Sequence, residues 1–408
     1  MSGDPAGRPP EPSEGSHGGS AWLSRNLLVL CGVSLLQDAA SELIYPLLPL
    51  LLTVTLAAPA AVVGIIEGVA EGAAALTKLL AGRAADRQPR RRPLVSAGYA
   101  MAAVGKVIVA AATVWPVALV GRVVDRVGKG IRGAPRDSLL VEGVAVDRRG
   151  AAFGLHRAAD TVGAILGPLA GIGLYALVGL RGALWIAVVP ATLSALLTVA
   201  VRDKPRQQVL ESPTEGPGRA PPTAHPRFRP GPELRHVLVL LTAFALVNLP
   251  DALLLLRASD IGFGASGLLA LYVAYNCSYA ALSFPFGALS DRVPKRLVVA
   301  GGLGVFAGIY VALGLSTDRT VAVALFLLYG AYAAATDGVG KAWVSSLSPA
   351  GSQGSAQGLF QGLSGVGVLV AGIWGGLTWG SAGEVPLVVA GSAAGLLAVL
   401  VAVGLKGR

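Results

Sequence analysis

Two carboxylates stand within a stretch of this chain that is otherwise apolar enough to lie in lipid. The stretch, LLQDAASELIYPLLPLLL, covers residues 35–52 and contains Asp38 and Glu42. Four residues apart, they would share one face of a helix. A charged side chain at the middle of a bilayer costs about 2.5–3.5 kcal/mol on insertion scales, so it usually faces a cavity or a partner. These two carboxylates could therefore bind protons, a substrate or both.

Further charged side chains lie in neighbouring apolar segments at helical spacing. Glu67 and Glu71 repeat the four-residue interval, and a later segment carries a stripe of cations every three or four residues. Counting inward from the expected helix ends places many of them near the bilayer midplane, where transporters bind substrate. The groups expected at the site in the first half of the chain are Asp38, Glu42, Glu67, Glu71, Arg126, Lys129, Arg132, Arg157 and Asp160.

The second half of the chain is sparser in such groups, and it contributes Asp251, Asp337 and Lys341. This asymmetry indicates that the first half carries proton coupling and much of the charge recognition. A carboxylate beside other carboxylates in a low dielectric can exchange a proton at physiological pH, but a nearby Lys or Arg opposes this. The sequence leaves open which acid titrates. It also leaves open whether other charges serve function or only structure, as neutralised pairs: Lys78, Lys106, Arg122, Arg136 and Asp137.

The composition is that of a protein whose helices cross a membrane many times. Hydrophobic residues make up 53% of the 408 residues and charged residues only 14%, with a mean hydropathy of +0.65. A soluble domain is about 25% charged. The 55 glycines suit helices that pack closely in lipid. The apolar runs are long and unbroken, which argues against a β-barrel.

Twelve apolar segments reach the length of roughly 20 residues that a spanning helix needs. The first six are predicted at 26–54, 60–81, 93–115, 117–141, 151–177 and 181–202, and the second six at 236–257, 265–289, 296–315, 319–344, 355–379 and 384–405. The predicted organisation is a disordered cytoplasmic N-terminus (1–25), a six-helix bundle (26–202), a Pro-rich cytoplasmic linker (203–235) and a second six-helix bundle (236–405).

The positive charges predict the orientation. The net charge of +10 is concentrated in short loops that follow the second, fourth and eighth spans, and in the linker. By the positive-inside rule these loops and both termini should be cytoplasmic. A charge so placed does not indicate a nucleic-acid partner; the expected partners are the lipid bilayer of the cell membrane, protons and a small-molecule substrate, with the chain as a monomer.

The two halves repeat one another. GRAADRQPRRRPL at 82–94 matches GALSDRVPKRLVV at 287–299, and DRVGK at 125–129 matches DGVGK at 337–341. FGLHRAADTVGAILG at 153–167 and QDA at 37–39 have weaker counterparts at nearly the same offset. The chain is therefore expected to be an all-α membrane protein of 12 transmembrane helices, in two six-helix bundles related by internal duplication. Parallel repeats around a central cavity are a transporter architecture.

The repeated loop resembles the signature of the major facilitator superfamily. It reads Gly82-x-x-x-Asp86-Arg87-x-x-Arg90 in the first half and Gly287-x-x-x-Asp291-Arg292 in the second, with Pro89 and Pro294 where the family usually has Gly. GPLAG at 167–171 resembles a shortened motif of proton-coupled antiporters, and the resemblance covers nearly the whole chain. It implies that the Asp and Arg residues of the loop clamp cytoplasmic helix ends together, forming a gate. Within the superfamily the chain resembles a poorly characterised prokaryotic group.

The sequence thus predicts a secondary transporter of the cell membrane, with proton-coupled export by antiport as the first expectation because of GPLAG. One alternative is a proton-coupled importer of an anionic metabolite or chelate, and another is a sensor or scaffold that binds a ligand without moving it. An enzyme, a metal site and a cofactor are not expected. Only one of the four His residues lies in a span, and the chain has neither a metal-spaced Cys pair nor a phosphate-binding Gly-rich loop with Lys.

Overall fold

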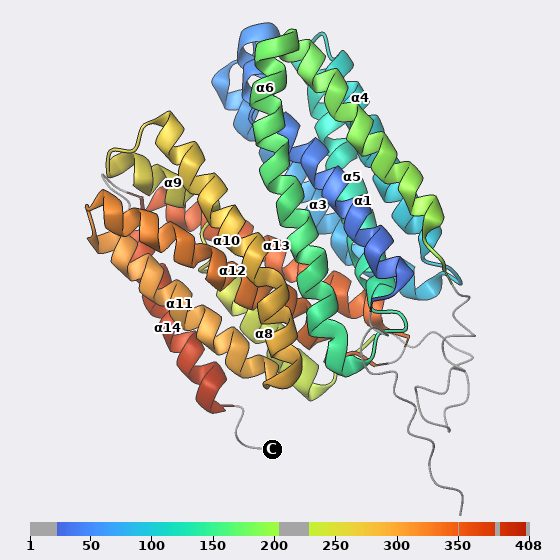
Figure 1. Cartoon of the computed structure of the whole chain (residues 1–408), viewed down its shortest axis with the longest axis vertical. Helices are drawn as coiled ribbons and strands as arrows, with labels where there is room; N and C mark the ends of the chain where they lie inside the picture. The colour runs from blue at the N-terminus through green and yellow to red at the C-terminus, as the bar shows by residue number, and fades with distance from the viewer. Residues whose placement is uncertain (1–22, 204–227, 350, 380–383, 405–408) are drawn as a thin grey trace, which may run out of the picture.

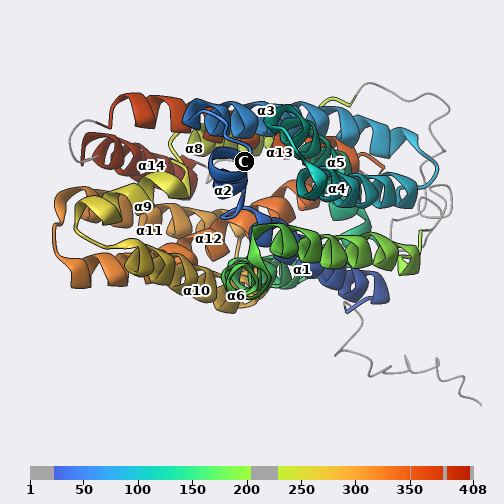
Figure 2. The same cartoon turned by 90° about the horizontal axis from the view of Figure 1, so that it is seen from above.

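The computed structural model of the chain describes residues 23–203, 228–349, 351–379 and 384–404, and these residues form helices and turns without a strand. The predicted N-terminal segment and linker fall largely outside this part. Two helical bundles stand side by side (Figure 1), and in the view from above they adjoin along the middle of the molecule (Figure 2). The predicted fold class, 12 spans in two bundles of six, is confirmed.

The first bundle follows the predicted spans with two irregularities. Its helices are α1 (Arg25–Ile44), α2 (Leu48–Leu50) with a π-helical turn (Leu51–Thr55), α3 (Ala60–Arg87), α4 (Arg92–Ala111), α5 (Trp115–Leu140) and α6 (Arg149–Leu197), with 3-10 turns at Val146–Arg148 and Thr198–Ala200. The first span is interrupted at 45–47, where Pro46 cannot donate a helical hydrogen bond. α6 contains the fifth and sixth spans, which meet at Gly179 with φ +72°, a conformation that favours glycine.

The second bundle repeats this order. Its helices are α8 (Pro232–Ala245), α9 (Asp251–Asp260), α10 (Ala265–Arg292), α11 (Lys295–Leu315), α12 (Arg319–Leu347), α13 (Gln353–Leu377) and α14 (Glu384–Gly404). α8 begins four residues before the prediction, with Pro232 at its first position, where a missing N–H is harmless. The seventh span is broken between α8 and α9, because Pro250 disfavours helical conformation in the residue before it.

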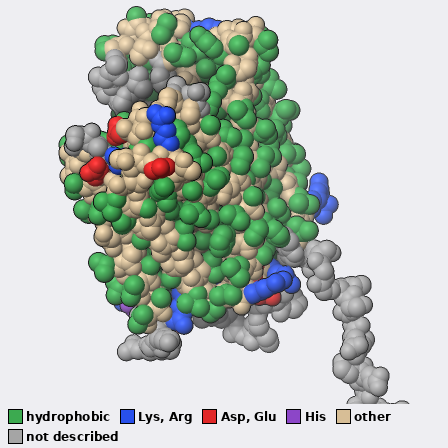
Figure 3. All heavy atoms as spheres, turned by 60° about the vertical axis from the view of Figure 1, so that its left-hand side comes forward, with side chains coloured by type: hydrophobic (Ala, Val, Ile, Leu, Met, Phe, Trp, Pro, Cys, Tyr) green, Lys and Arg blue, Asp and Glu red, His purple; other side chains and the backbone are tan. Residues whose placement is uncertain are grey.

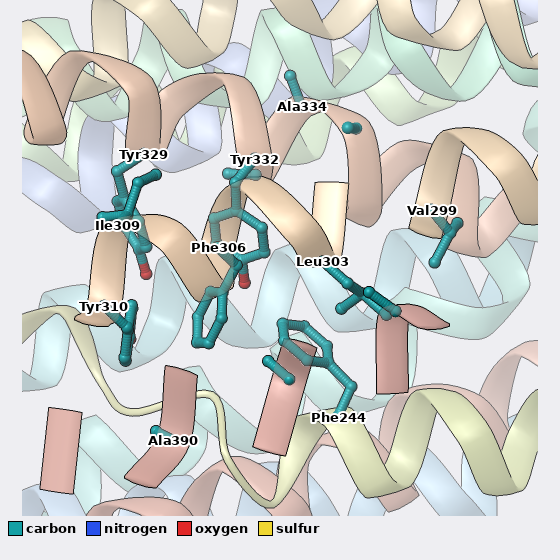
Figure 4. Packing of buried hydrophobic residues seen from close by; sticks show 14 of the residues in the cluster. Phe244, Val299, Leu303, Phe306, Ile309, Tyr310, Tyr329, Tyr332, Ala334 and Ala390 are labelled. Carbon is teal, nitrogen blue, oxygen red and sulfur yellow. The ribbon is translucent and has the colours of Figure 1, made fainter. Parts of the chain in front are cut away.

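The hydrophobic cores of the two bundles differ. In the second bundle one continuous cluster runs through the helices, built around aromatic rings that stack or meet edge to face (Figure 4). Phe306 stacks on Tyr310 with ring centroids 3.8 Å apart, and Phe244 meets Phe306 at 5.1 Å. In the first bundle the described core forms two main clusters, one around Leu47, Leu51 and Ala183 and one around Leu27, Tyr99 and Phe153. Charged groups of α4 and α5 lie in the interior of this bundle.

The outer surface is apolar, as a bilayer requires. Hydrophobic side chains cover most of the face in Figure 3, and the few charged ones in view form small groups toward its margins. Eight helices in the described part are long and apolar enough to cross a membrane by length and composition. α3 and α5 are not among them, although each is long enough. The charged side chains of α5 lower its hydropathy, and several of them, including Arg122, Asp125 and Arg132, are buried inside the protein.

The two bundles meet at one end and diverge toward the other (Figure 1). The contacts run between α3 and α13 and between α6 and α10. Glycines allow the backbones to touch: a Cβ on Gly82 would lie 2.8 Å from the Cα of Gly358, and Gly150 and Gly287 face one another in the same way. We call this end, which carries Asp86 and Asp291, the Asp86 end.

Candidate functional site

A cavity of about 190 Å³ lies between the bundles and is lined mainly by charged and hydroxyl groups. Three helices of the first bundle face α10 of the second across it. The lining residues are Asp38, Ser41 and Glu42 of α1; Asp125, Lys129 and Arg132 of α5; Arg157, Asp160, Thr161 and Ala164 of α6; and Tyr272, Tyr275, Asn276 and Tyr279 of α10. Six of the residues expected at the site from the sequence therefore share one cavity.

One group of charges behind the cavity is fully paired. Lys106 of α4 donates to Asp125 of α5 at 2.8 Å, and Arg122 lies 3.5 Å from the other oxygen of that carboxylate. All three side chains are buried. Gly105 and Gly121 bring the α4 and α5 backbones close enough for this pairing, since a Cβ at either would clash with the opposite helix. Two cations thus share one carboxylate, and the contact positions α5 against α4.

Arg132 is held at the cavity wall by an aromatic ring. Its guanidinium carbon lies 4.4 Å from the centroid of the Tyr99 ring, and the residue is only 4% exposed. The Tyr99 hydroxyl is itself 3.2 Å from the hydroxyl of Ser34, which fixes the ring. Nη1 of Arg132 is buried and has no hydrogen-bond partner in the described part of the protein. Such a group is costly unless a ligand satisfies it.

Arg157 joins the two bundles across the floor of the cavity. It donates to Asp337 of α12 at 2.8 Å and to the hydroxyl of Tyr279, which in turn donates to Asp337 at 2.5 Å. Arg157 also lies 3.7 Å from Asp160, whose other neighbour is His156 at 3.6 Å. The expected site residues Asp337 and Arg157 thus meet as an ion pair between bundles rather than as separate groups.

Asp251 lies in a different environment, among tyrosines of the second bundle. Its two oxygens accept hydrogen bonds from Tyr275 at 2.6 Å and Tyr329 at 2.9 Å. No cation lies within ion-pair distance of it in the described residues. Tyr275 lines the cavity, so Asp251 contacts the site through that hydroxyl.

The remaining expected site residues lie around the cavity. Glu71 forms an ion pair with Arg126 at 3.1 Å. Lys341 lies 3.0 Å from Asp137, which is fully buried and also accepts from Arg136 and from Gln361 of α13. Lys341 therefore belongs to a second contact between bundles. The side chain of Glu67 lies outside the described part of the structure.

The gate residues show a symmetric arrangement at the Asp86 end. Asp86, at the end of α3, accepts from the backbone N–H of Gly354 at 2.9 Å and of Ser355 at 2.6 Å, at the start of α13. Asp291, at the end of α10, accepts from Gly150 and Ala151 at 2.8 Å each, at the start of α6. Each carboxylate of one bundle thus caps a helix N-terminus of the other, where the helix dipole favours negative charge.

The arginines of the same loops do not take part in these contacts. Arg87, Arg90 and Arg292 are exposed, and the described residues offer them no ion pair. The clamp seen here is therefore carboxylate to helix N-terminus. Gly82 and Gly287 contribute by letting the backbones approach.

Sequence reasoning singles out Tyr275 and Asn276 of α10 as polar groups within a span, but it misses Tyr272 and Tyr279 as lining residues. Tyr272, Tyr275 and Tyr279 stand at intervals of three and four residues, so helical spacing alone could have placed them on one face. The sequence carried no comparable signal for the Tyr99 ring under Arg132, because that contact joins α4 to α5. The sequence leaves a structural and a functional role open for Asp137, and in the structure this residue joins the bundles through Lys341 and Gln361.

Comparison with known proteins agrees with this architecture. The family model described as Major Facilitator Superfamily matches residues 30–273 and 238–407. A protein of Methanocaldococcus jannaschii described as an uncharacterized MFS-type transporter is 30% identical over 370 residues, which cover 88% of this chain and 89% of that protein.

Solved structures of transporters have the same fold. The human organic anion transporter superposes with a TM-score of 0.75 at 17% identity, covering 92% of this chain and 99% of the other. The fucose:proton symporter of E. coli superposes with a TM-score of 0.69 at 12% identity, covering 94% and 98%. At such identities the likeness concerns the fold.

Proposed function

The chain belongs to the major facilitator superfamily, and from this premise we propose that it is a proton-coupled secondary transporter of a small molecule in the cell membrane. The observation that carries the proposal is the pair Asp38 and Glu42 on the wall of the cavity between the bundles. Coupling to protons requires a titratable group at or near the substrate site around which the bundles rock. Asp38 lies within electrostatic range of the Asp160 carboxylate as well as of Lys129 and Arg132.

Coupling follows if protons and substrate compete for these acids. A proton on Asp38 removes the charge that a substrate would meet, and a bound substrate removes the site at which the proton would bind. The carboxylates Asp86 and Asp291 hold the Asp86 end together while the opposite end diverges. With the loops at the Asp86 end and both termini placed in the cytoplasm by their positive charge, this arrangement is the outward-facing state.

For direction, we propose export in exchange for protons, on the strength of GPLAG at 167–171. Gly163 and Gly167 of this region let α6 pack on the backbone of α1, where a Cβ on Gly167 would lie 2.6 Å from the oxygen of Ala39. α1 carries both carboxylates, so movement of α6 is transmitted to them. The bundle limits 26–202 and 236–405, with a cytoplasmic linker at 203–235 and a monomeric chain, belong to the same proposal.

Proton-coupled import is the second candidate. The cations Lys129 and Arg132 on the cavity wall favour it, since they would attract an anionic metabolite. Among the proteins of similar structure, one is a fucose:proton symporter and another an organic anion transporter.

Proteoliposomes without a pH gradient distinguish the candidates. A panel of anionic, cationic and zwitterionic small molecules is added outside, and a pH electrode follows the weakly buffered medium. Antiport acidifies the medium because protons leave as substrate enters, whereas symport makes it alkaline. Uptake of a labelled compound with no pH change would refute proton coupling, and binding without any uptake would identify a sensor.

A further inference from the structure

Among the residues that the structure describes, four charged side chains of the cavity have no partner of opposite charge within ion-pair distance. In the part of the chain that the structure describes, neither Asp38 nor Glu42 comes within the 4.0 Å of an ion pair to any cation. Lys129 and Arg132 likewise have no carboxylate within that distance. The other cavity charges are paired, as Asp125 is with Lys106 and Arg157 with Asp337. Two negative and two positive groups are thus left for another molecule.

The two free pairs lie on different helices. Asp38 and Glu42 project from α1 with Ser41 beside them, and Lys129 and Arg132 project from α5. Asp38 is within electrostatic range of both cations, and Glu42 is within range of Lys129. They therefore face a common space while remaining too far apart to neutralise one another directly.

Resting on the proposed function, we propose that the substrate is a small zwitterion, whose anionic group binds Arg132 and Lys129 and whose cationic group binds Asp38 and Glu42. Arg132 offers its free, buried Nη1 from a guanidinium held over Tyr99. A guanidinium presents a planar fork that matches a carboxylate, so it recognises that group better than a point charge does.

The balance of charge favours a zwitterion over a simple ion. A bound anion would leave Asp38 and Glu42 without a counter-charge unless protons neutralised both. A bound cation would leave Lys129 and Arg132 without a counter-charge. Uncompensated charge in a low dielectric is expensive. A zwitterion satisfies both pairs at once.

The cavity also limits the size and character of the substrate. Its 190 Å³ is smaller than the roughly 300–1,000 Å³ of common ligand pockets, so the occupant is small. Tyr272 and Tyr279 form part of the opposite wall. Their rings and hydroxyls suit an apolar, aromatic or hydroxylated body attached to the charged groups. α-Amino acids have this chemistry.

Matched derivatives test the charge requirement. The purified full chain is melted with glycine, L-valine or L-phenylalanine, and with the N-acetyl and methyl ester forms of each. N-acetylation removes the positive charge and esterification the negative one, while the body stays the same. At least one free amino acid should raise the melting temperature and bind at least about tenfold more tightly, by titration calorimetry, than either of its derivatives.

Variants locate the two charged contacts. Arg132→Gln and Glu42→Gln should each weaken binding of that amino acid at least about tenfold. Arg132→Lys, which keeps the charge without the fork, should fall between Arg132→Gln and the unaltered chain. Arg235→Gln and Asp260→Asn change exposed charges away from the cavity and should leave affinity unchanged. Size-exclusion profiles show which variants remain folded. If Arg132→Gln does not fold, Arg132→Lys still tests the contact.

Three outcomes overturn the inference: an N-acetyl derivative that binds as tightly as its amino acid, an ester that does so, or a panel in which no amino acid binds. Binding in detergent needs no proton gradient. Amino acids that bind without moving protons would therefore contradict the proposed coupling and leave this inference standing. Proton-coupled flux of a simple ion would support the coupling and contradict this inference.

Discussion

Charged residues inside the first bundle fall into two kinds that differ in what they contact. Lys106 and Asp125 are buried against one another at 2.8 Å and have little left to offer a ligand. Asp38 and Lys129 lie on the cavity wall, and no described residue is within ion-pair distance of either. Substitutions in the first kind should therefore change stability, and substitutions in the second should change binding and coupling.

Asp125→Asn should destabilise the protein more than Lys106→Met. Without its carboxylate, two buried cations lose their shared counter-charge, and breaking a buried pair costs about 3–5 kcal/mol. Lys106→Met leaves Asp125 paired with Arg122 at 3.5 Å, so a smaller loss is expected. Melting temperatures of the solubilised variants give the comparison. Equal losses, or an Asp125→Asn variant as stable as the unaltered chain, would contradict the assignment.

Asp38→Asn should uncouple transport from protons. The amide keeps the size of the side chain but cannot gain and lose the proton, so a pH gradient should no longer accelerate substrate movement. Downhill exchange of labelled substrate should persist at a lower rate, because Glu42, Lys129 and Arg132 remain. Asp260→Asn is the matched control at an exposed position. Flux that still responds fully to the pH gradient would remove Asp38 from the coupling step.

The sequence predicts many of the residues that line the site, but it does not predict which of the charged residues pair with one another. Charges at helical spacing in apolar segments marked Asp38, Lys129 and Arg132 as cavity residues, because lipid excludes them. Pairing depends on which helices adjoin, and the sequence does not show that ion pairs join α4 to α5 and α6 to α12. For the same reason Arg157 and Asp337 could not be recognised as partners.

At the scale of helices, closeness of approach decides how the bundles fit together. α3 and α13 touch through backbone at Gly82, Gly354 and Gly358, and α6 and α10 touch through Gly150, Gly154 and Gly287. Hydropathy and loop charge predicted these helices and their order, since both depend on local composition. The predicted gap between 177 and 181 contains the turn at Gly179, whereas the seventh span was predicted as continuous at 236–257 and is interrupted at 246–250, beside Pro250. Hydropathy averages over many residues, so it does not register the effect of a single Pro on the backbone.

Gly82→Ala should weaken the contact between α3 and α13. The new Cβ would lie 2.5 Å from the backbone oxygen of Gly354 and 2.8 Å from the Cα of Gly358, and overpacking of this kind costs about 1–3 kcal/mol. Spin labels placed on α3 and α13, in a chain lacking Cys31 and Cys277, should report a longer distance at the Asp86 end. Gly72→Ala, on the same helix with nothing within 4 Å of its Cβ, should leave it unchanged. An unchanged distance in both variants would show that the glycine contact does not hold the bundles together.

At the scale of the whole molecule, the two halves of the duplicated chain make equivalent contacts with one another, but the interiors of the two bundles differ. Asp86 and Asp291 cap opposing helix N-termini in the same way, so the Asp86 end is close to symmetric. The interiors differ, with charge in the first bundle and a continuous aromatic core in the second. This division suggests that the second bundle acts as a rigid body against which the charged bundle moves.

Asp86→Asn and Asp291→Asn should each slow transport without changing substrate affinity. Each carboxylate accepts two hydrogen bonds from the other bundle, and hydrogen bonds to charged groups are worth about 1.5–3 kcal/mol. Losing that energy makes the conformation described here less populated. The return to this conformation then limits the rate of the transport cycle. Steady-state flux should show a lower maximal rate at constant KM, and the double variant should be slower than either single one. A changed KM with an unaltered rate would place these residues in binding instead.

The pair between Lys106 and Asp125 also bears on how the chain enters the bilayer during synthesis. α5 is not among the helices apolar enough to cross unaided, because of the charges that it carries. Entering lipid alone, it would expose Asp125 at a cost of about 2.5–3.5 kcal/mol on the translocon scale. α4 is synthesised immediately before it, is apolar, and presents Lys106 to that carboxylate. The counter-charge is therefore in place when α5 emerges, and the two helices can leave the translocon together as a hairpin.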